Sequence, residues 1–390
     1  MQITDINGVF SDGISAGIKA NGRLDLAYIY LPNCTGSAIV CSQNLIRSVT
    51  LVHNERVFQE NVVKLLIVNS GNANSVTGNI GAIHVEQTVK AAAEKFGCSE
   101  QEVGVASTGI IGVPLPIEKV VKGINTFSLA QLKGELAAEA ILTTDLVKKT
   151  AYRSIEIQGA SVNIAGITKG SGMISPNMAT TLGFIVTDLK LSSNQCQQVL
   201  KYAINESYNM LSVDTDQSTN DMVSLQSSGA IDLALSDIDL HAFQNALTDV
   251  CIDLAKQIAR DGEGASHFIE VNVHGAYTKA DAKRVAKLVV DSPLVKTAIA
   301  GEDPNWGRII MAVGKDPNVR LEHSKLSIQI NGHAIFTDGV PLHVKRNDLK
   351  KVMSQQDIII SITIGNGDAM ATAWGCDLTH GYIDINTEYN

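Results

Sequence analysis

The sequence predicts a mixed α and β protein, and three observations support that fold class. Short apolar runs rich in Val and Ile, such as 63–69 and 161–167, alternate with longer amphipathic segments. Hydrophobic residues make up 45% of the 390-residue chain and charged residues only 18%. A chain of this length and composition can bury one large hydrophobic core or two of ordinary size. No apolar stretch reaches the roughly 18 residues that a membrane span requires. We therefore expect a globular protein with no membrane partner.

The predicted strands and helices differ in the spacing of their apolar residues. Strands are expected, in chain order, at 63–69, 103–106, 153–157, 161–167, 182–186, 268–273, 326–330 and 358–364. Residues 84–96 place Val85, Val89 and Ala92 on one stripe, as a helix does, and 192–210, 240–259 and 280–290 repeat that period. Ser99 and Glu102 have the spacing of a capping box.

The charge of the chain narrows the possible partners. The formal net charge is −9 and no run of Lys and Arg concentrates positive potential, which argues against nucleic acid or an anionic membrane and favours small molecules. The N-terminus carries acids early and lacks a basic segment followed by an apolar one, so a cytoplasmic location is expected. The six cysteines form no CxxC pair and the nine histidines no HExxH motif, so we expect reduced cysteines and no metal.

Gly and Asn gather in five loops, at 69–78, 107–112, 169–173, 261–264 and 301–307. The ordinary explanation is that such residues supply positive φ angles at turns. Gly-rich backbone can also approach a ligand closely and direct N–H donors at it, as oxyanion and carboxylate sites require. Neither GxxxxGK[ST] nor a GxGxxG after a strand occurs, so a phosphate cradle is not predicted.

A candidate nucleophile, Thr180, lies in the polar stretch 176–181, which runs directly into the predicted strand 182–186. An internal threonine hydroxyl is a poor nucleophile, but cleavage just before it exposes an α-amino group that acts as its base. Such an amine has a pKa of about 8, which suits proton transfer near neutral pH. The bond between Ala179 and Thr180 joins a small residue to Thr. Composition and spacing alone do not single it out.

Eight blocks of sequence carry a family resemblance. They are KGSGMISPNMATTLGFIVTD, NSGNAN, ASTGIIG, LTTD, DTDQSTND, DGEGA, SPLVKTAIAGEDPNWGRI and WGCDLTHGYIDIN. Together they resemble the ornithine acetyltransferase family (glutamate N-acetyltransferases) from near residue 8 to the C-terminus. The resemblance implies a layered αββα sandwich of the type found in certain self-processing aminopeptidases, a smaller C-terminal lobe, and an α2β2 heterotetramer.

The resemblance also implies self-cleavage between Ala179 and Thr180. The products would be an α chain, 1–179, and a β chain, 180–390, of 390 − 179 = 211 residues, which share one main core. Thr180 would then attack N2-acetylornithine, release ornithine and pass the acetyl group to glutamate in a ping-pong reaction of arginine biosynthesis. No cofactor is implied. Acetyl-CoA is a possible second donor, and the sequence holds no residue that decides this.

The family's site residues map onto this sequence by motif. Thr108 and Gly109 match its oxyanion hole, although by themselves residues 107–109 would be interpreted as a turn after the strand 103–106. The ligand contacts fall on Thr143, Lys169, Thr180, Glu263 and Asn386. By charge, Lys169 suits a substrate carboxylate and Glu263 a substrate ammonium group, whereas either side chain alone would be interpreted as a solvated surface group.

The sequence departs from the family at a few positions. Thr181 stands where many members have Met, which places two hydroxyls side by side, and we assign the nucleophile to Thr180 because it follows Ala179. His267 replaces a more usual Lys without a functional explanation. The family's last ligand contact follows its final Tyr, and the sequence ends at Asn390 just after Tyr389, so that contact is not assigned.

Two other functions stay open. The first is an amide or peptide hydrolase of the same fold, in which Thr180 acts and water replaces glutamate. The second is a binding protein that keeps the pocket without turnover. Retention of all the site residues together weighs against the binding protein.

Overall fold

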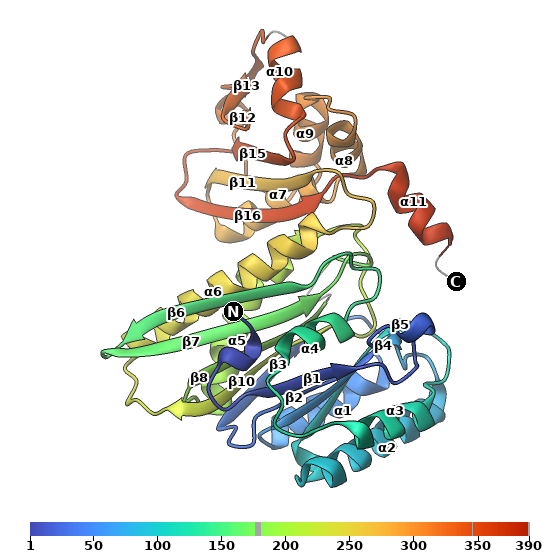
Figure 1. Cartoon of the computed structure of the whole chain (residues 1–390). Coiled ribbons are helices and arrows are strands. Elements are labelled where there is room, and N and C mark those ends of the chain that lie inside the picture. Colours follow the sequence, from blue (N-terminus) through green and yellow to red (C-terminus); the bar gives the residue numbers. More distant parts are fainter. Residues whose placement is uncertain (176–180, 345, 389–390) are drawn as a thin grey trace. The chain divides into compact units, whose positions relative to one another are not determined.

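Figure 1 shows the computed structural model of the chain, which describes residues 1–175, 181–344 and 346–388. Contacts divide the chain into two compact units. Unit 1 comprises Met1–Gly170, Pro176–Asn209 and Gln217–Leu254, and unit 2 comprises Ser171–Ser175, Met210–Asp216 and Ala255–Asn390. The smaller C-terminal lobe expected from the sequence is unit 2.

Unit 1 contains two sheets. The first has the order β1 (Phe10–Ile14), β2 (Leu26–Tyr30), β4 (Leu65–Asn72) and β5 (Val103–Ile110), and only its β4–β5 pair is parallel. The second has the order β3 (Gly36–Cys41), β10 (Met222–Ile231), β8 (Leu182–Leu189), β7 (Ala160–Lys169) and β6 (Lys149–Ile157), and only its β10–β8 pair is parallel.

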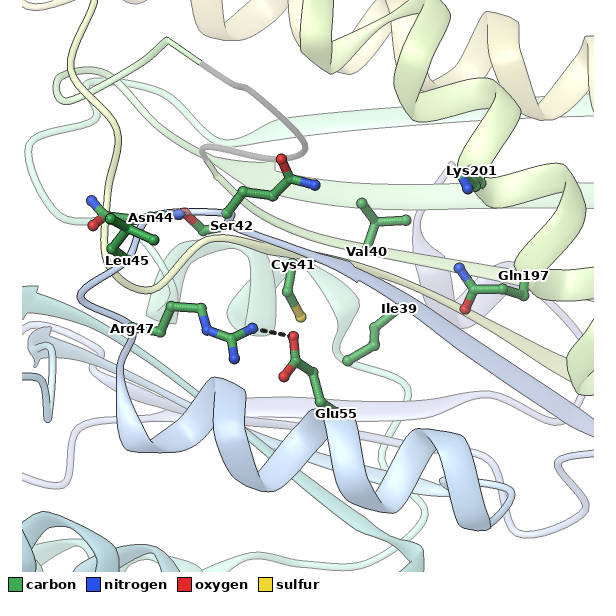
Figure 2. Close-up of a pocket in the computed structure, with 11 residues that line it drawn as sticks. Ile39, Val40, Cys41, Ser42, Asn44, Leu45, Arg47, Glu55, Gln197 and Lys201 are labelled. Carbon is green, nitrogen blue, oxygen red and sulfur yellow. Dashed lines mark hydrogen bonds and ion pairs between the residues drawn. The ribbon is translucent and has the colours of Figure 1, made fainter.

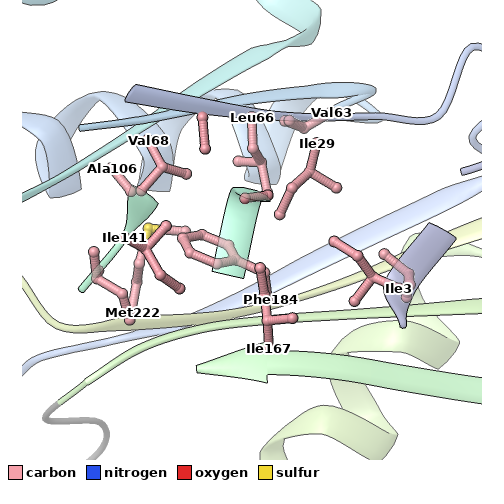
Figure 3. Packing of buried hydrophobic residues seen from close by; sticks show 14 of the residues in the cluster. Ile3, Ile29, Val63, Leu66, Val68, Ala106, Ile141, Ile167, Phe184 and Met222 are labelled. Atoms are coloured by element: carbon pink, nitrogen blue, oxygen red, sulfur yellow. The ribbon is translucent and has the colours of Figure 1, made fainter. Parts of the chain in front are cut away.

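The main core lies between these two sheets (Figure 3). Leu66 and Val68 of the first sheet belong to the same buried cluster as Ile167, Phe184 and Met222 of the second. Because side chains alternate along a strand, the neighbours of Leu66 and Val68 on β4 point to the other face of the first sheet. That face packs on α2 (Gly78–Phe96) and α3 (Ile117–Thr126).

Helices also cover the second sheet. α5 (Ser193–Glu206) packs on β3, and Leu254 of α6 (Asp237–Arg260) lies against Gly166 of β7. Unit 1 is therefore the layered αββα sandwich that the sequence resemblance implied. Its remaining helical elements are α1 (Val49–Glu60), α4 (Gly134–Ala140), and the 3-10 helices η1 (Ile3–Asp5), η2 (Ala20–Gly22) and η3 (Glu100–Glu102).

Unit 2 is built on a third sheet. Its order is β14 (Val340–Pro341), β13 (His333–Thr337), β12 (Ser327–Ile330), β15 (Asp357–Thr363), β11 (Phe268–Ala276), β16 (Ala369–Cys376) and β9 (Leu211–Ser212). α7 (Lys279–Val290) packs on β11 and β16. The other helical elements are α8 (Pro293–Ala300), α9 (Trp306–Val313), α10 (Arg346–Met353), α11 (His380–Thr387) and η5 (His323–Lys325), while η4 (Tyr208–Met210) lies where the two units divide.

The predicted helices and strands are confirmed, with shifted ends. Ser99 and Glu102 form the expected capping box of η3. The predicted helix 192–210 stops at Glu206 and is followed by η4. The alternative that residues 107–109 form a turn is wrong, because β5 continues to Ile110 through its pairing with β4. Within the described part of the chain, no helix is both long and apolar enough to cross a membrane.

Candidate active site

Thr108 and Gly109 lie near the end of β5, opposite Gly71 and Asn72 of β4, where a β-bulge or similar irregularity shifts the register between the two strands. Gly109 has φ +133°, and a Cβ atom there would lie 2.3 Å from the backbone carbon of Gly71. Only glycine fits this close approach of two strands. The half-buried Thr108 hydroxyl is thus carried by a rigid strand pair. Such bulges often redirect a side chain beside an active site.

Buried asparagines support this strand end. Asn69 accepts a hydrogen bond from the Ser107 hydroxyl at 2.6 Å and donates to the carbonyl of Asn72 at 2.9 Å. Asn220 donates to the carbonyls of Ala73 and Ser107 at 2.6 and 2.9 Å. Buried backbone groups need such partners. These two amides therefore hold the end of β4 and the segment after it to the strand that carries Thr108.

Lys169 is the last residue of β7, and its Nζ lies 3.3 Å from the Thr108 Oγ1. An ammonium group only donates, so the Thr108 oxygen accepts and its own proton is free to point elsewhere. The structure therefore joins two residues that the sequence predicted for separate roles. The ammonium group would also polarise the hydroxyl and make it a stronger donor.

Thr143 lies in a bend that follows α4, and side chains bind the backbone of this bend through hydrogen bonds. Lys19 Nζ donates to the carbonyl of Leu142 at 2.6 Å, and an Arg23 Nη donates to the carbonyl of Thr143 at 3.1 Å. The Thr143 N–H donates to Asp145 at 3.0 Å. Burial, together with the charge of Arg23, lowers the pKa of Lys19 to about 8. Thr143 itself is half-buried.

Two buried acids of unit 1 were missed by the sequence reasoning. Asp145 and Asp221 lie in the LTTD and DTDQSTND blocks, where local sequence does not distinguish a buried acid from a solvated one. Burial raises the pKa of Asp221 well above its ordinary value, although the charge of Lys169 opposes this. One carboxyl oxygen of Asp221 has no hydrogen-bond partner among the described residues.

The predicted nucleophile Thr180 and its neighbour Ala179 lie outside the described residues. The next residue, Thr181, leads into β8, and its carbonyl accepts the N–H of Met222 at 2.9 Å. The Thr181 side chain is 2% exposed, and its hydroxyl has no partner within the described part of the chain. A hydroxyl buried in this way is poorly placed to meet a dissolved substrate.

Within unit 2, the structure brings together Glu263 and Asn386, the two remaining predicted ligand contacts. Asn386 of α11 donates from Nδ2 to the Glu263 carboxylate at 2.8 Å. Glu263 is 8% exposed, and its N–H donates to the carbonyl of Ser171 at 3.0 Å. A Cβ atom on Gly172 would lie 2.2 Å from a carboxylate oxygen of Glu263, so glycine is required there.

His267, the replacement without a functional explanation, has a structural one. Its Nδ1 lies 2.8 Å from the carboxylate of Asp377, which also accepts the backbone N–H groups of Ser266 and His267. Asp377 is 2% exposed. The imidazole thus partners a buried acid, as the more usual Lys would by charge.

A separate cavity of about 550 Å³ lies beside the end of β3 in unit 1 (Figure 2). Its lining residues are Ile39, Val40, Cys41, Ser42, Gln43, Asn44, Leu45, Arg47, Glu55, Gln197 and Lys201. They include none of the predicted site residues that the structure describes. Arg47 and Glu55 pair across it, and burial raises the pKa of the Cys41 thiol to about 12, which keeps it protonated. A protonated thiol is a poor nucleophile.

Comparisons with known proteins extend over the whole chain. The profile of the ArgJ family matches residues 11–390. The arginine biosynthesis bifunctional protein ArgJ of Oceanobacillus iheyensis is 42% identical over 100% of this chain and 96% of its own length. The protein of the same name from Gloeobacter violaceus is 38% identical over 99% of this chain and 97% of its own length. The crystal structure of this bifunctional protein from Bacillus halodurans is 40% identical, with a TM-score of 0.50, over 53% of this chain and 98% of that one.

A layered αββα unit with a hydroxyl, a tight glycine backbone and an ammonium group at one strand end suits an enzyme that works on acyl groups. Because the family profile and the relatives match almost the whole chain, the chain belongs to the ArgJ family, which is the family that its motifs resemble. It is an acetyltransferase of arginine biosynthesis.

Proposed function

We propose that this protein transfers the acetyl group of N2-acetylornithine to glutamate through an acetyl ester of Thr180. The observation that carries the proposal is the contact between Lys169 and Thr108 beside Gly109. That contact directs a polarised hydroxyl and a glycine backbone to one place, where they can stabilise the oxyanion of an acyl transfer.

The proposed reaction begins with hydrolysis of the bond between Ala179 and Thr180. The Thr180 hydroxyl attacks the carbonyl of Ala179, whose acyl group moves from the nitrogen to the oxygen of Thr180. Water then hydrolyses that ester, which leaves Ala179 with a carboxylate and Thr180 with its hydroxyl and a free α-amino group. That amine takes the hydroxyl proton as the Thr180 oxygen attacks the acetyl carbonyl, and returns it to ornithine as the C–N bond breaks. Glutamate then attacks the ester with its α-amino group, and the hydroxyl is restored.

We assign the substrate contacts from the family motifs and from charge. Lys169 suits the α-carboxylate, Glu263 suits an ammonium group, and Thr143 and Asn386 offer hydrogen bonds. Thr108 and Gly109 serve the oxyanion. Thr180 remains the nucleophile, and the burial of Thr181 supports that choice over its neighbour.

Self-cleavage, an α2β2 assembly and a cytoplasmic location are parts of the same proposal. The matched chain of the Bacillus halodurans protein is about half as long as this one, since 98% of it covers 53% of this chain. A length of that kind is expected for one product of a cleaved precursor. Cross-linking followed by denaturing mass analysis tests the assembly, with pairs of each fragment expected.

The acceptor decides between a transferase and a hydrolase. We expect acetylornithine and glutamate to give acetylglutamate and ornithine in equal amounts, with little free acetate. Omission of glutamate should stop ornithine release after one acetyl group per site, because the ester then waits for its acceptor. Continued release of acetate at an undiminished rate would instead establish the hydrolase. A parallel reaction with acetyl-CoA as donor tests the second activity, which the name of the relatives as bifunctional proteins motivates.

Glu263→Gln tests the ammonium partner. We expect the KM for acetylornithine to rise about 10- to 100-fold with a smaller change in kcat, because a neutral amide keeps the hydrogen bond to Asn386 but loses the charge. Steady-state kinetics measure the change. Glu270→Gln is the control, since Glu270 is another glutamate of unit 2 whose side chain is largely out of solvent, and it pairs with Lys256 at 2.9 Å. An unchanged KM in Glu263→Gln would remove this assignment.

A further inference from the structure

Asp145 of the LTTD block is a buried carboxylate with three hydrogen-bond donors. It accepts the N–H of Thr143 at 3.0 Å, the N–H of Gly170 at 2.6 Å and the ammonium group of Lys149 at 2.7 Å. The side chains of Asp145 and Lys149 are both 0% exposed. A fully buried charge persists only where partners of this kind compensate for lost hydration.

The carboxylate stays ionised at working pH. Burial alone would raise its pKa, but the charges of Lys169 and Lys149 outweigh burial and lower the pKa of Asp145 to about 2. Lys149 supplies the ion pair, and the charge of Lys169 acts on the same carboxylate. Asp145 is thus permanently negative beside the lysine that contacts Thr108.

The two N–H donors belong to the two segments that carry predicted substrate contacts. Thr143 itself gives one, and Gly170, the residue after Lys169, gives the other. Gly170 has φ +153°, at the point where the chain leaves β7. A single carboxylate therefore fixes the Thr143 bend and the turn that follows Lys169 with respect to each other.

We propose that Asp145 is a positioning residue that holds Thr143 and Lys169 in the arrangement that receives the amino-acid substrate. This inference rests on the proposed function of the site. The competing explanation is that Asp145 only neutralises Lys149 within the core of unit 1. The two differ in prediction, because a purely structural ion pair affects the folded fraction and not the kinetic constants of the folded enzyme.

Asp145→Asn is the test variant, because it keeps the shape of the side chain and directs an amide NH₂ toward groups that are themselves donors. We expect kcat/KM for acetylornithine to fall about 10- to 100-fold per cleaved chain, and ornithine to bind more weakly in calorimetry by a similar factor. Lys169→Met should also lower kcat/KM for acetylornithine. The double variant should lose much less than the product of the two single losses, because Asp145 acts in part through Lys169.

Asp188→Asn is the matched control. Asp188 is 3% exposed in the same unit and accepts both the backbone N–H and the side-chain amide of Asn163, at 2.8 and 2.7 Å. Asp188→Asn should lower the melting temperature and leave kcat/KM unchanged.

Unchanged kinetic constants in folded Asp145→Asn would overturn the proposal. So would a double variant whose loss of kcat/KM equals the product of the losses in Asp145→Asn and Lys169→Met. A wild-type protein that binds ornithine without transferring acetyl would refute the proposed function alone, and the ornithine affinity of Asp145→Asn would still decide the role of Asp145. No binding by the wild type would refute both.

Discussion

Thr180→Ala is expected to leave the chain uncut and inactive. Denaturing mass spectrometry should find one species near 41.6 kDa, where the wild type gives two fragments, the larger of which begins at Thr180. Without the hydroxyl there is no group to attack the preceding peptide bond, and without cleavage there is no α-amino base. Transfer of acetyl from acetylornithine should fall by at least about 10⁴-fold, because one substitution removes both nucleophile and base.

Two further variants separate chemistry from folding. Thr180→Ser keeps a hydroxyl and should still be cut, with lower activity. Thr181→Val is the matched neighbour, whose buried hydroxyl has no described partner, so its loss should leave cleavage and transfer intact. Cleavage that persists in Thr180→Ala and fails in Thr181→Val would move the nucleophile by one residue. An active wild-type enzyme that remains a single 41.6 kDa species would refute self-cleavage altogether.

The elements of the fold that are buried on a regular face could be predicted from the sequence. The run 182–186 is apolar throughout because β8 is buried on both faces, and the observed strand extends to Leu189. Residues 107–109 show why composition can mislead. Ser, Thr and Gly favour a turn locally, yet pairing with β4 keeps them extended. Tertiary pairing overrode local preference at the position of the proposed oxyanion donors.

The contacts of the candidate site were less predictable than its members. Motifs identified Thr108 and Lys169 separately, but the two lie on β5 and β7 of different sheets, 61 positions apart. No local pattern encodes such a meeting. The charge of Lys169 suggested only a substrate carboxylate, whereas its position also bears on the Thr108 hydroxyl. Asp145 was missed for a related reason, since an acid in a bend ordinarily faces water.

Thr108→Val is expected to lower kcat about 100- to 1,000-fold with little change in the KM for acetylornithine. Valine keeps the shape and the β-branch that suit a strand, and removes only the hydroxyl. The hydroxyl would bond the oxyanion more strongly than the ground-state carbonyl, so its loss raises the barrier and spares substrate binding. Because the same donors would serve self-cleavage, rates must be expressed per cleaved chain, as measured by mass spectrometry.

Thr187→Val is the control for the loss of a threonine hydroxyl in unit 1. Thr187 of β8 is fully buried; its hydroxyl donates to the carbonyl of Asn163 at 2.8 Å and accepts the N–H of Leu189 at 3.2 Å, so its loss should cost about 1–3 kcal/mol of stability with kcat unchanged. A large loss of kcat in Thr108→Val, with none in Thr187→Val, would show that the hydroxyl that Lys169 contacts lowers the activation barrier. A loss below threefold would mean that this hydroxyl only supports the strand end, and the oxyanion donors would then have to be sought among backbone N–H groups near Gly109.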